Sequence, residues 1–153
     1  MKRELASAIG IRPMESGDRG FVLDSFRRNI MSDATVLDLL GFGCVSDHVA
    51  QLERLVRGGI GSFAVASLAD SPDCIEGWAA SCNGRLVFAY VRPAFRRWGI
   101  AGALVDVLLP EVTPMPLVYW TRDAEAIHRE HGYPLTWDWE TFREINRKPR
   151  RAA

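Results

Sequence analysis

The chain has 153 residues, of which 48% are hydrophobic and 25% charged, and its 19 basic and 19 acidic side chains give a formal net charge of zero. This length suits one domain that buries a hydrophobic core without metals or disulfides, and the composition excludes a disordered or collagen-like chain. The zero net charge excludes a global electrostatic field that would draw the protein to nucleic acid or to an anionic membrane.

The chain begins with a short strand that two helices follow. Residues 8–14 form an apolar run that ends at polar residues, and Ser16 or Asp18 is the expected N-cap of a helix over residues 19–30. A second helix is predicted over residues 46–59, because its apolar residues fall on one face and it ends at two glycines.

Three β-prone runs come next, over residues 62–69, 74–82 and 85–91. The Asn83-Gly84 dipeptide between the last two runs is the strongest short-range signal for a hairpin. We therefore expect an antiparallel meander in the middle of the chain.

Helices and strands alternate in the second half. A helix is predicted to begin at residue 98 and to end near Pro110. A strand over residues 116–121, a helix over residues 122–132 and a last strand over residues 135–142 complete the pattern. This order predicts an α/β (α+β) fold with flanking helices and a mixed, mostly antiparallel sheet of about six or seven strands.

The domain organisation is simple, with no repeat and no linker. Residues 1–145 are expected to form a single domain, and residues 146–153 a basic, frayed tail. The N-terminus lacks the uninterrupted apolar stretch of a signal peptide, and no apolar run is long enough to cross a membrane. The three cysteines, Cys44, Cys74 and Cys82, form no redox pair or zinc ribbon, so we expect buried, reduced thiols and a cytoplasmic protein.

The junction between the strand at 85–91 and the following helix carries the clearest chemical signal. The first amides of a helix have no partner within it, and the helix dipole adds partial positive charge there. Arg96 and Arg97 add two full charges, and small residues at 99, 101 and 102 leave the backbone open to a large anion such as a pyrophosphate. The same small residues would also let the helix pack closely on the sheet, so the pattern alone leaves both interpretations open. The sequence of a P-loop or of a Rossmann fingerprint is absent.

At these residues the chain resembles the GNAT superfamily of acetyl-CoA-dependent N-acetyltransferases, whose motif is [Q/R]-x-x-G-x-[G/A]. Arg96, Gly99 and Ala101 occupy its three fixed positions, and the order of elements over most of the chain is that of the superfamily. The resemblance implies a single GNAT-type domain that binds acetyl-CoA as acyl donor and acetylates an amine. The coenzyme-binding residues that it implies are Ala89, Tyr90, Val91, Arg96, Arg97, Trp98, Gly99, Ala101 and Gly102.

The resemblance also implies a role for each part of this site. The backbone amides from Arg97 to Gly102 would bind the pyrophosphate. The strand end from Ala89 to Val91 would hold the pantetheine arm, and the Val91 amide would polarise the acetyl carbonyl.

Two residues are candidates for proton transfer. The general acid of the superfamily is commonly a tyrosine five residues before the aromatic of a Y-x-x-x-G-[F/Y] motif, and the same count from Tyr133 reaches His128. A histidine transfers protons readily near neutral pH, so His128 is either the general acid or a sign that acetyl transfer has been lost. Glu76 is a candidate general base by position, as are Asp123 and Glu125, although many members use a water chain instead.

The same helix raises the question of a metal. His128 and His131 lie three residues apart on one helix face, but no third or fourth ligand is near in the sequence. No metal site is predicted.

Three functions remain open at this stage. The first is an N-acetyltransferase. The second is a catalytically inactive GNAT-like module that binds a partner protein. The third is a nucleic-acid-modifying protein resembling the compact GNAT-like proteins that phages encode, against which the neutral net charge argues.

The acceptor is not identified by the sequence. The resemblance implies that segments 31–44 and 129–135 surround it, and neither is strongly acidic, so a polycation is not indicated. The last strand is a candidate edge for pairing two subunits into a homodimer.

Overall fold

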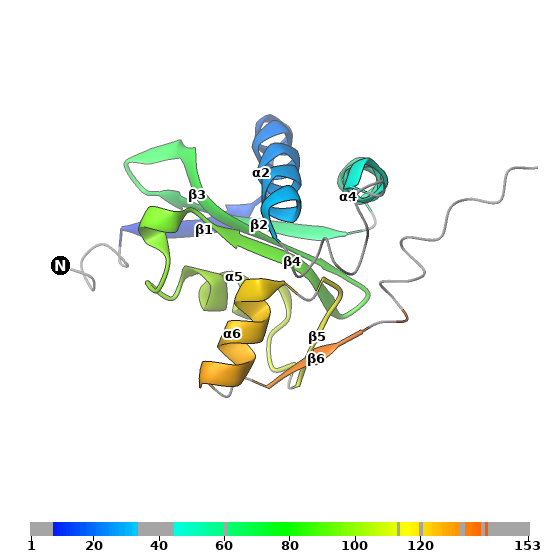
Figure 1. Cartoon of the computed structure of the whole chain (residues 1–153). Coiled ribbons are helices and arrows are strands. Elements are labelled where there is room, and N and C mark those ends of the chain that lie inside the picture. Colours follow the sequence, from blue (N-terminus) through cyan, green and yellow to red (C-terminus); the bar gives the residue numbers. More distant parts are fainter. Residues whose placement is uncertain are drawn as a thin grey trace, which may run out of the picture.

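The structure, a computed structural model, describes residues 8–33, 45–59, 61–112, 114–119, 121–131, 134–138 and 140. In this part of the chain a six-stranded sheet runs in the order β1-β2-β3-β4-β5-β6, with helices on both faces (Figure 1). The strands are β1 (Ile9–Pro13), β2 (Ser62–Leu68), β3 (Ser71–Cys82), β4 (Arg85–Val91), β5 (Met115–Leu117) and β6 (Leu135–Trp137). The helices are α2 (Arg19–Ser32), α4 (Val45–Gly58), α5 (Ile100–Leu108) and α6 (Arg122–His131). The predicted α/β architecture is confirmed.

Strands β2 to β4 form the predicted antiparallel meander, and β1 adds a further antiparallel strand beside β2. Asn83 and Gly84, which join β3 to β4, have φ angles of 50° and 74°. Both values are positive, as a tight turn between antiparallel strands requires. The hairpin signal in the sequence is therefore confirmed.

The sheet opens between β4 and β5. These two strands are parallel, and the register pairs Leu86 with Leu117, with a hydrogen bond of 2.9 Å from the Val118 amide to the Leu86 carbonyl. Beyond this point β4 continues to Val91, whereas β5 has ended. The second half of β4 therefore has a paired edge on β3 and, within the described residues, an unpaired edge toward β5.

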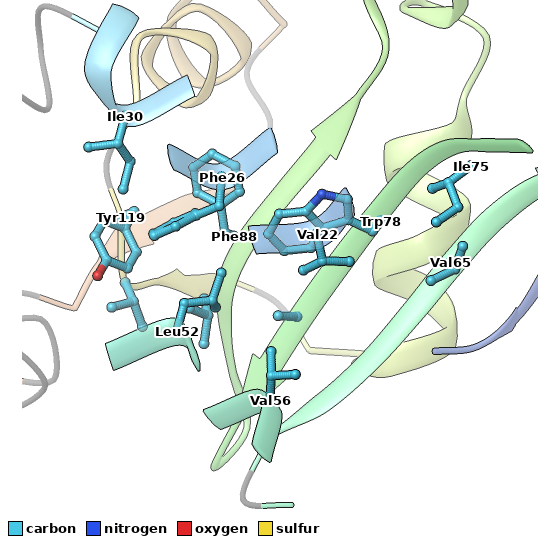
Figure 2. Close-up of a cluster of buried hydrophobic side chains, with 13 residues drawn as sticks. Val22, Phe26, Ile30, Leu52, Val56, Val65, Ile75, Trp78, Phe88 and Tyr119 are labelled. Carbon is cyan, nitrogen blue, oxygen red and sulfur yellow. The ribbon is translucent and has the colours of Figure 1, made fainter. Parts of the chain in front are cut away.

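One face of the sheet is covered by α2 and α4, which pack over a core of aromatic side chains (Figure 2). Trp78 is fully buried, and its indole nitrogen donates a hydrogen bond of 2.7 Å to the Ser25 hydroxyl of α2. Phe26 makes an edge-to-face contact with Phe88, at 5.0 Å between ring centroids. These contacts fix α2 against β3 and β4.

The buried Tyr119 hydroxyl on this face lies 2.8 Å from Nδ1 of the buried His48 in α4. Burial raises the pKa of the Tyr119 hydroxyl well above its ordinary range. The pair ties α4 to the segment that follows β5.

The opposite face carries α5 and α6 (Figure 1). Ile100 and Leu104 of α5 are buried in a second cluster that includes Ala79 of β3 and Ala124 of α6. The small side chains of the sheet on this face allow α5 to lie close to the strands that precede it.

Several element boundaries differ from the prediction. Helix α5 begins at Ile100 rather than at residue 98, because Arg97 and Gly99 have positive φ angles of 65° and 81°, which a right-handed helix cannot contain. Strand β6 ends at Trp137, well short of residue 142, and β5 ends at Leu117 rather than at residue 121.

The prediction of buried cysteines is wrong for Cys74, which is exposed, and Cys82 is half-buried. Cys44 and the predicted basic tail lie outside the described residues. None of the described helices is long and apolar enough to cross a membrane.

Candidate functional site

The start of α5 leaves a row of backbone amides without helical partners. The first hydrogen bond of the helix runs from the Ala103 amide to the Gly99 carbonyl, at 3.0 Å. No side chain in the described part of the chain caps this helix. Because the amides of residues 100–102 precede that first bond, they remain available to an anion, as the sequence predicts.

The backbone of the loop before α5 also favours binding of an anion beside these amides. Arg97 and Gly99 both have positive φ angles, separated by Trp98. Alternation of backbone handedness turns successive amides toward one side of the chain, which is the geometry of an anion-binding nest. A Cβ at Gly99 would meet nothing within 4 Å, so this glycine is explained by its backbone conformation rather than by crowding.

The register of β3 and β4 determines which main-chain groups of β4 face the opening in the sheet. The Arg92 amide donates a hydrogen bond of 2.8 Å to the Glu76 carbonyl, so this pair is of the hydrogen-bonded type. Such pairs alternate with non-bonded pairs along an antiparallel ladder. Tyr90, opposite Trp78, therefore directs its main chain toward β3, whereas Ala89 and Val91 direct theirs toward the unpaired edge.

Arg96 lies at this edge. Its Nε donates a hydrogen bond of 3.1 Å to the Val91 carbonyl, and its Nη1 is 4.0 Å from a carboxylate oxygen of Asp123 on α6. The Val91 carbonyl therefore points toward the unpaired edge of β4, as the register of β3 and β4 requires. The Arg96 guanidinium therefore contacts both β4 and α6. The side chain of Arg97, in the loop before α5, is exposed.

The aromatic residues predicted to bind the coenzyme are held by packing. Trp98 is half-buried and makes an edge contact with Phe95, at 5.0 Å between ring centroids. Tyr90 is half-buried on the α2 face, with its ring 6.1 Å from that of Phe21. Since the Tyr90 main chain is used by β3, only its side chain is available to a ligand.

Gly77 sets the distance between α5 and the sheet. A Cβ at this position would lie 2.8 Å from the Tyr90 carbonyl oxygen and 3.3 Å from Cγ2 of Ile100, the first residue of α5. Real Cβ atoms do not approach a backbone oxygen this closely. The start of α5 therefore reaches its position beside the end of β4 because residue 77 is glycine.

Glu76 is a buried carboxylate on the α2 side of the same strand end. Its side chain is 7% exposed, and its Oε2 has no hydrogen-bond partner among the residues that the structure describes. The nearest cation is Arg92, whose Nε lies 3.6 Å from that oxygen. A buried, unpaired carboxylate oxygen is costly, so this candidate base is distinguished from an ordinary surface acid.

The other acids proposed as bases are surface residues. Asp123 is 70% exposed and faces Arg96, and Glu125 pairs with Arg129 one turn further along α6. Of the three carboxylates considered, Glu76 alone is buried.

His128 lies on α6 with its side chain exposed. Tyr133, from which its position was counted, lies outside the described residues, as does most of the segment 31–44 that was expected to surround the acceptor. Within the described residues no three His, Cys, Asp or Glu side chains gather closely enough to hold a metal ion.

The sequence did not single out Arg92 or Phe21, which lie beside Glu76. The guanidinium carbon of Arg92 is 5.0 Å from the centre of the Phe21 ring. The only sequence signal was that Arg92 directly follows the strand end expected to bind pantetheine. Its pairing with Glu76 depends on the register of the hairpin, which is shifted by an irregularity between Ala80 and Ser81.

The chain matches no known family model and no curated protein sequence. Its fold, however, matches solved structures. A predicted acetyltransferase from Clostridium acetobutylicum, solved with acetyl-CoA, aligns with a TM-score of 0.55 over 86% of this chain and 93% of its own, at 16% identity. A possible acetyltransferase from Clostridium difficile 630 aligns with a TM-score of 0.51 over 82% of this chain and 88% of its own, at 15% identity.

Another neighbour aligns over a smaller part of both chains. An acetyltransferase of the GNAT family from Staphylococcus aureus Mu50 aligns over 66% of this chain and 63% of its own, at 19% identity and a TM-score of 0.47. The chain thus spans less than two thirds of that protein's length. The two matches with TM-scores above 0.5 show that the chain has the GNAT fold, as predicted, and they leave the site residues, the acceptor and the phage resemblance as predictions.

Proposed function

We propose that this protein is an N-acetyltransferase that moves an acetyl group from acetyl-CoA to an amine. The observation that carries the proposal is the meeting of two features at one point. The uncapped amides of residues 100–102 lie at the start of α5, and the main-chain groups of Ala89 and Val91 face the opening between β4 and β5. A pyrophosphate fits the first feature and an extended pantetheine arm fits the second.

In the proposed reaction acetyl-CoA supplies an activated acyl group as a thioester. Glu76 takes a proton from the acceptor ammonium, and the amine nitrogen then forms a bond to the acetyl carbon. The Val91 amide donates a hydrogen bond to the carbonyl oxygen as it gains negative charge. The carbon–sulfur bond breaks, and the leaving thiolate receives a proton from His128. The second proton of the amine nitrogen then returns to His128, and Glu76 passes the first proton to water.

Two features support these assignments of proton carriers. Glu76 is buried, and its Oε2 lacks a hydrogen-bond partner among the described residues, so that this oxygen can accept a hydrogen bond from a bound ammonium. His128 is exposed on α6, the helix that Arg96 and Asp123 connect to the end of β4.

The proposal is tested by the release of coenzyme A thiol from acetyl-CoA in the presence of a panel of primary amines. The His128→Ala variant should lose about a hundredfold in kcat, the lower end of the range for a general acid. The His128→Tyr variant restores the side chain usual in the superfamily and should recover the rate. Equal rates for the parent protein and both variants would remove His128 from the mechanism, and release by no amine at all would reject acetyl transfer.

A second candidate function is a GNAT-fold module that binds a partner protein without catalysis. The observation that favours it is the histidine at position 128, where the superfamily commonly has tyrosine. This candidate predicts that acetyl-CoA is neither bound nor consumed by the folded protein. The third alternative, modification of nucleic acid, is based on the resemblance to compact phage-encoded proteins; the net charge of zero argues against it, and the basic tail, which leaves it open, lies outside the described residues.

A further inference from the structure

Oε2 of Glu76 lacks a hydrogen-bond donor among the described residues, although the carboxylate forms an ion pair with Arg92. The side chain is more than nine-tenths buried, and its Oε2 lies 3.6 Å from Arg92 Nε, beyond hydrogen-bond distance. Arg92 does not supply the missing bond, because its Nε already donates to the Ile75 carbonyl at 2.7 Å. An ammonium group placed beside Glu76 would satisfy this oxygen with a charge-assisted hydrogen bond.

Arg92 offers the opposite charge a short distance away. Its Nε donates a hydrogen bond to the Ile75 carbonyl, and its guanidinium carbon lies 5.0 Å from the centre of the Phe21 ring. Within the described residues no hydrogen bond occupies its Nη1 or Nη2, and the side chain is 45% exposed. Two terminal nitrogens of a fixed guanidinium are suited to a carboxylate, which they bind in a planar, bidentate manner.

Both groups lie beside the atoms of the proposed reaction. The Arg92 amide is bonded to the Glu76 carbonyl, and the preceding residue is Val91, whose main chain faces the opening of the sheet. The rings of Phe21 and Tyr90, inclined at 59° to each other, flank the same position on the α2 face. This position on the α2 face therefore combines the carboxylate of Glu76, the guanidinium of Arg92 and the apolar rings of Phe21 and Tyr90.

We propose that the acceptor is a free α-amino acid, and this inference rests on the proposed function. Glu76 binds the ammonium group of the amino acid, and Arg92 binds its carboxylate. The rings of Phe21 and Tyr90 contact the side chain of the amino acid. A monoamine without a carboxylate leaves Arg92 unpaired. A polyamine brings further positive charge against Arg92, which disfavours it. The N-terminus of a peptide has the ammonium but lacks the adjacent carboxylate.

The test compares each amino acid with its own α-amide, which removes the negative charge and keeps the size. The full chain is assayed for thiol release from acetyl-CoA with leucine, phenylalanine and glutamate and with the three corresponding amides. We expect at least one acid to exceed its amide about tenfold or more in kcat/KM, as a bidentate charged contact implies. The Arg92→Gln variant should raise KM for that acid more than KM for its amide, so that the preference for the acid is lost.

A matched control is Arg85→Gln, which removes a cation from the other end of β4, where Arg85 pairs with Asp138. This variant should keep the preference for the acid. Thiol release that is equal for acids and amides, or a preference that survives Arg92→Gln, would overturn the amino-acid proposal and leave acetyl transfer standing. Release with neither series, nor with any amine of the wider panel, would overturn both proposals.

Discussion

Asp18 shows how a single residue fixes the approach to α2. Its carboxylate accepts hydrogen bonds of 2.6 Å and 3.0 Å from the Arg12 guanidinium and one of 2.8 Å from the Glu15 amide. The sequence identified Asp18 as a candidate N-cap, and it does occupy that position. Its side chain, however, turns back to β1, so that it joins the first strand to the first helix.

The hydrogen bond from Arg12 lowers the pKa of Asp18 below its ordinary value. The contribution to stability is therefore complete above that ordinary value and is lost as the pH falls through the lowered pKa of the folded state. We expect Asp18→Asn to reduce the free energy of unfolding by about 2 kcal/mol at neutral pH, since charged hydrogen bonds are lost. Urea denaturation at a series of pH values measures the difference, which should shrink in strong acid.

The control for this prediction is Asp24→Asn on the same helix. Asp24 pairs with Arg28 one turn away, and both side chains are more than half exposed. An exposed pair of this kind contributes little. A loss at Asp24 as large as the loss at Asp18, or a difference that does not change with pH, would contradict the role assigned to Asp18.

Gly77 shows how one residue determines the position of the proposed coenzyme site. Because an added methyl group would collide with the Tyr90 carbonyl and touch Ile100, Gly77→Ala must move α5 or β4. We expect a loss of about 2 kcal/mol in stability, typical of an overpacked core, together with weaker acetyl-CoA binding. Chemical denaturation and calorimetric titration measure the two effects.

Gly10→Ala provides the comparison, because its Cβ would meet nothing within 4 Å. That variant should retain acetyl-CoA binding. If Gly77→Ala bound acetyl-CoA as tightly as the parent, the spacing between α5 and the sheet would not govern the site.

At the scale of elements, the opening between β4 and β5 makes a prediction about individual amides. Phe88 and Tyr90 donate toward β3, whereas Ala89 and Val91 face the unpaired edge. Without ligand, the amides of Ala89 and Val91 should exchange hydrogen with solvent much faster than those of Phe88 and Tyr90. Acetyl-CoA should slow the exchange at Ala89 and Val91 selectively, which NMR-detected exchange measures. Protection of all four amides without ligand would show that the edge is already paired.

The elements were largely predictable because local signals determine them. Helical spacing located α2 and α4, and the Asn83-Gly84 turn located the hairpin, whose backbone angles follow from these two residue types. The start of α5 was misplaced because Arg97 adopts a positive φ angle, which a non-glycine residue rarely does and which no local pattern announces. The early end of β6 depends on its pairing with β5, which is a tertiary contact.

The site was predictable only in part for a related reason. The uncapped amides of α5 follow from the order of strand, loop and helix, so the loop residues could be chosen from the sequence. The neighbourhood of Glu76 could not be predicted, because Arg92 directly follows the next strand and Phe21 comes from a helix more than fifty residues earlier in the chain. Their meeting depends on the sheet register and on the packing of α2.

At the scale of the whole molecule, the side chains packed on the two faces of the sheet have different structural roles. The aromatic core under α2 and α4 holds β3 and β4 rigidly, and the small residues under α5 bring its first turn close to the end of β4. The opening in the sheet lies between them. The central claim is that this arrangement binds acetyl-CoA.

Calorimetric titration of the full chain with acetyl-CoA tests that claim most directly. The Gly99→Glu variant places a carboxylate at the α5 amides, and Gly84→Glu adds the same charge at another glycine with positive φ, so the two share the backbone strain. We predict micromolar binding by the parent and by Gly84→Glu, and none by Gly99→Glu. A folded parent protein that does not bind acetyl-CoA, or equal binding by all three proteins, would contradict the account.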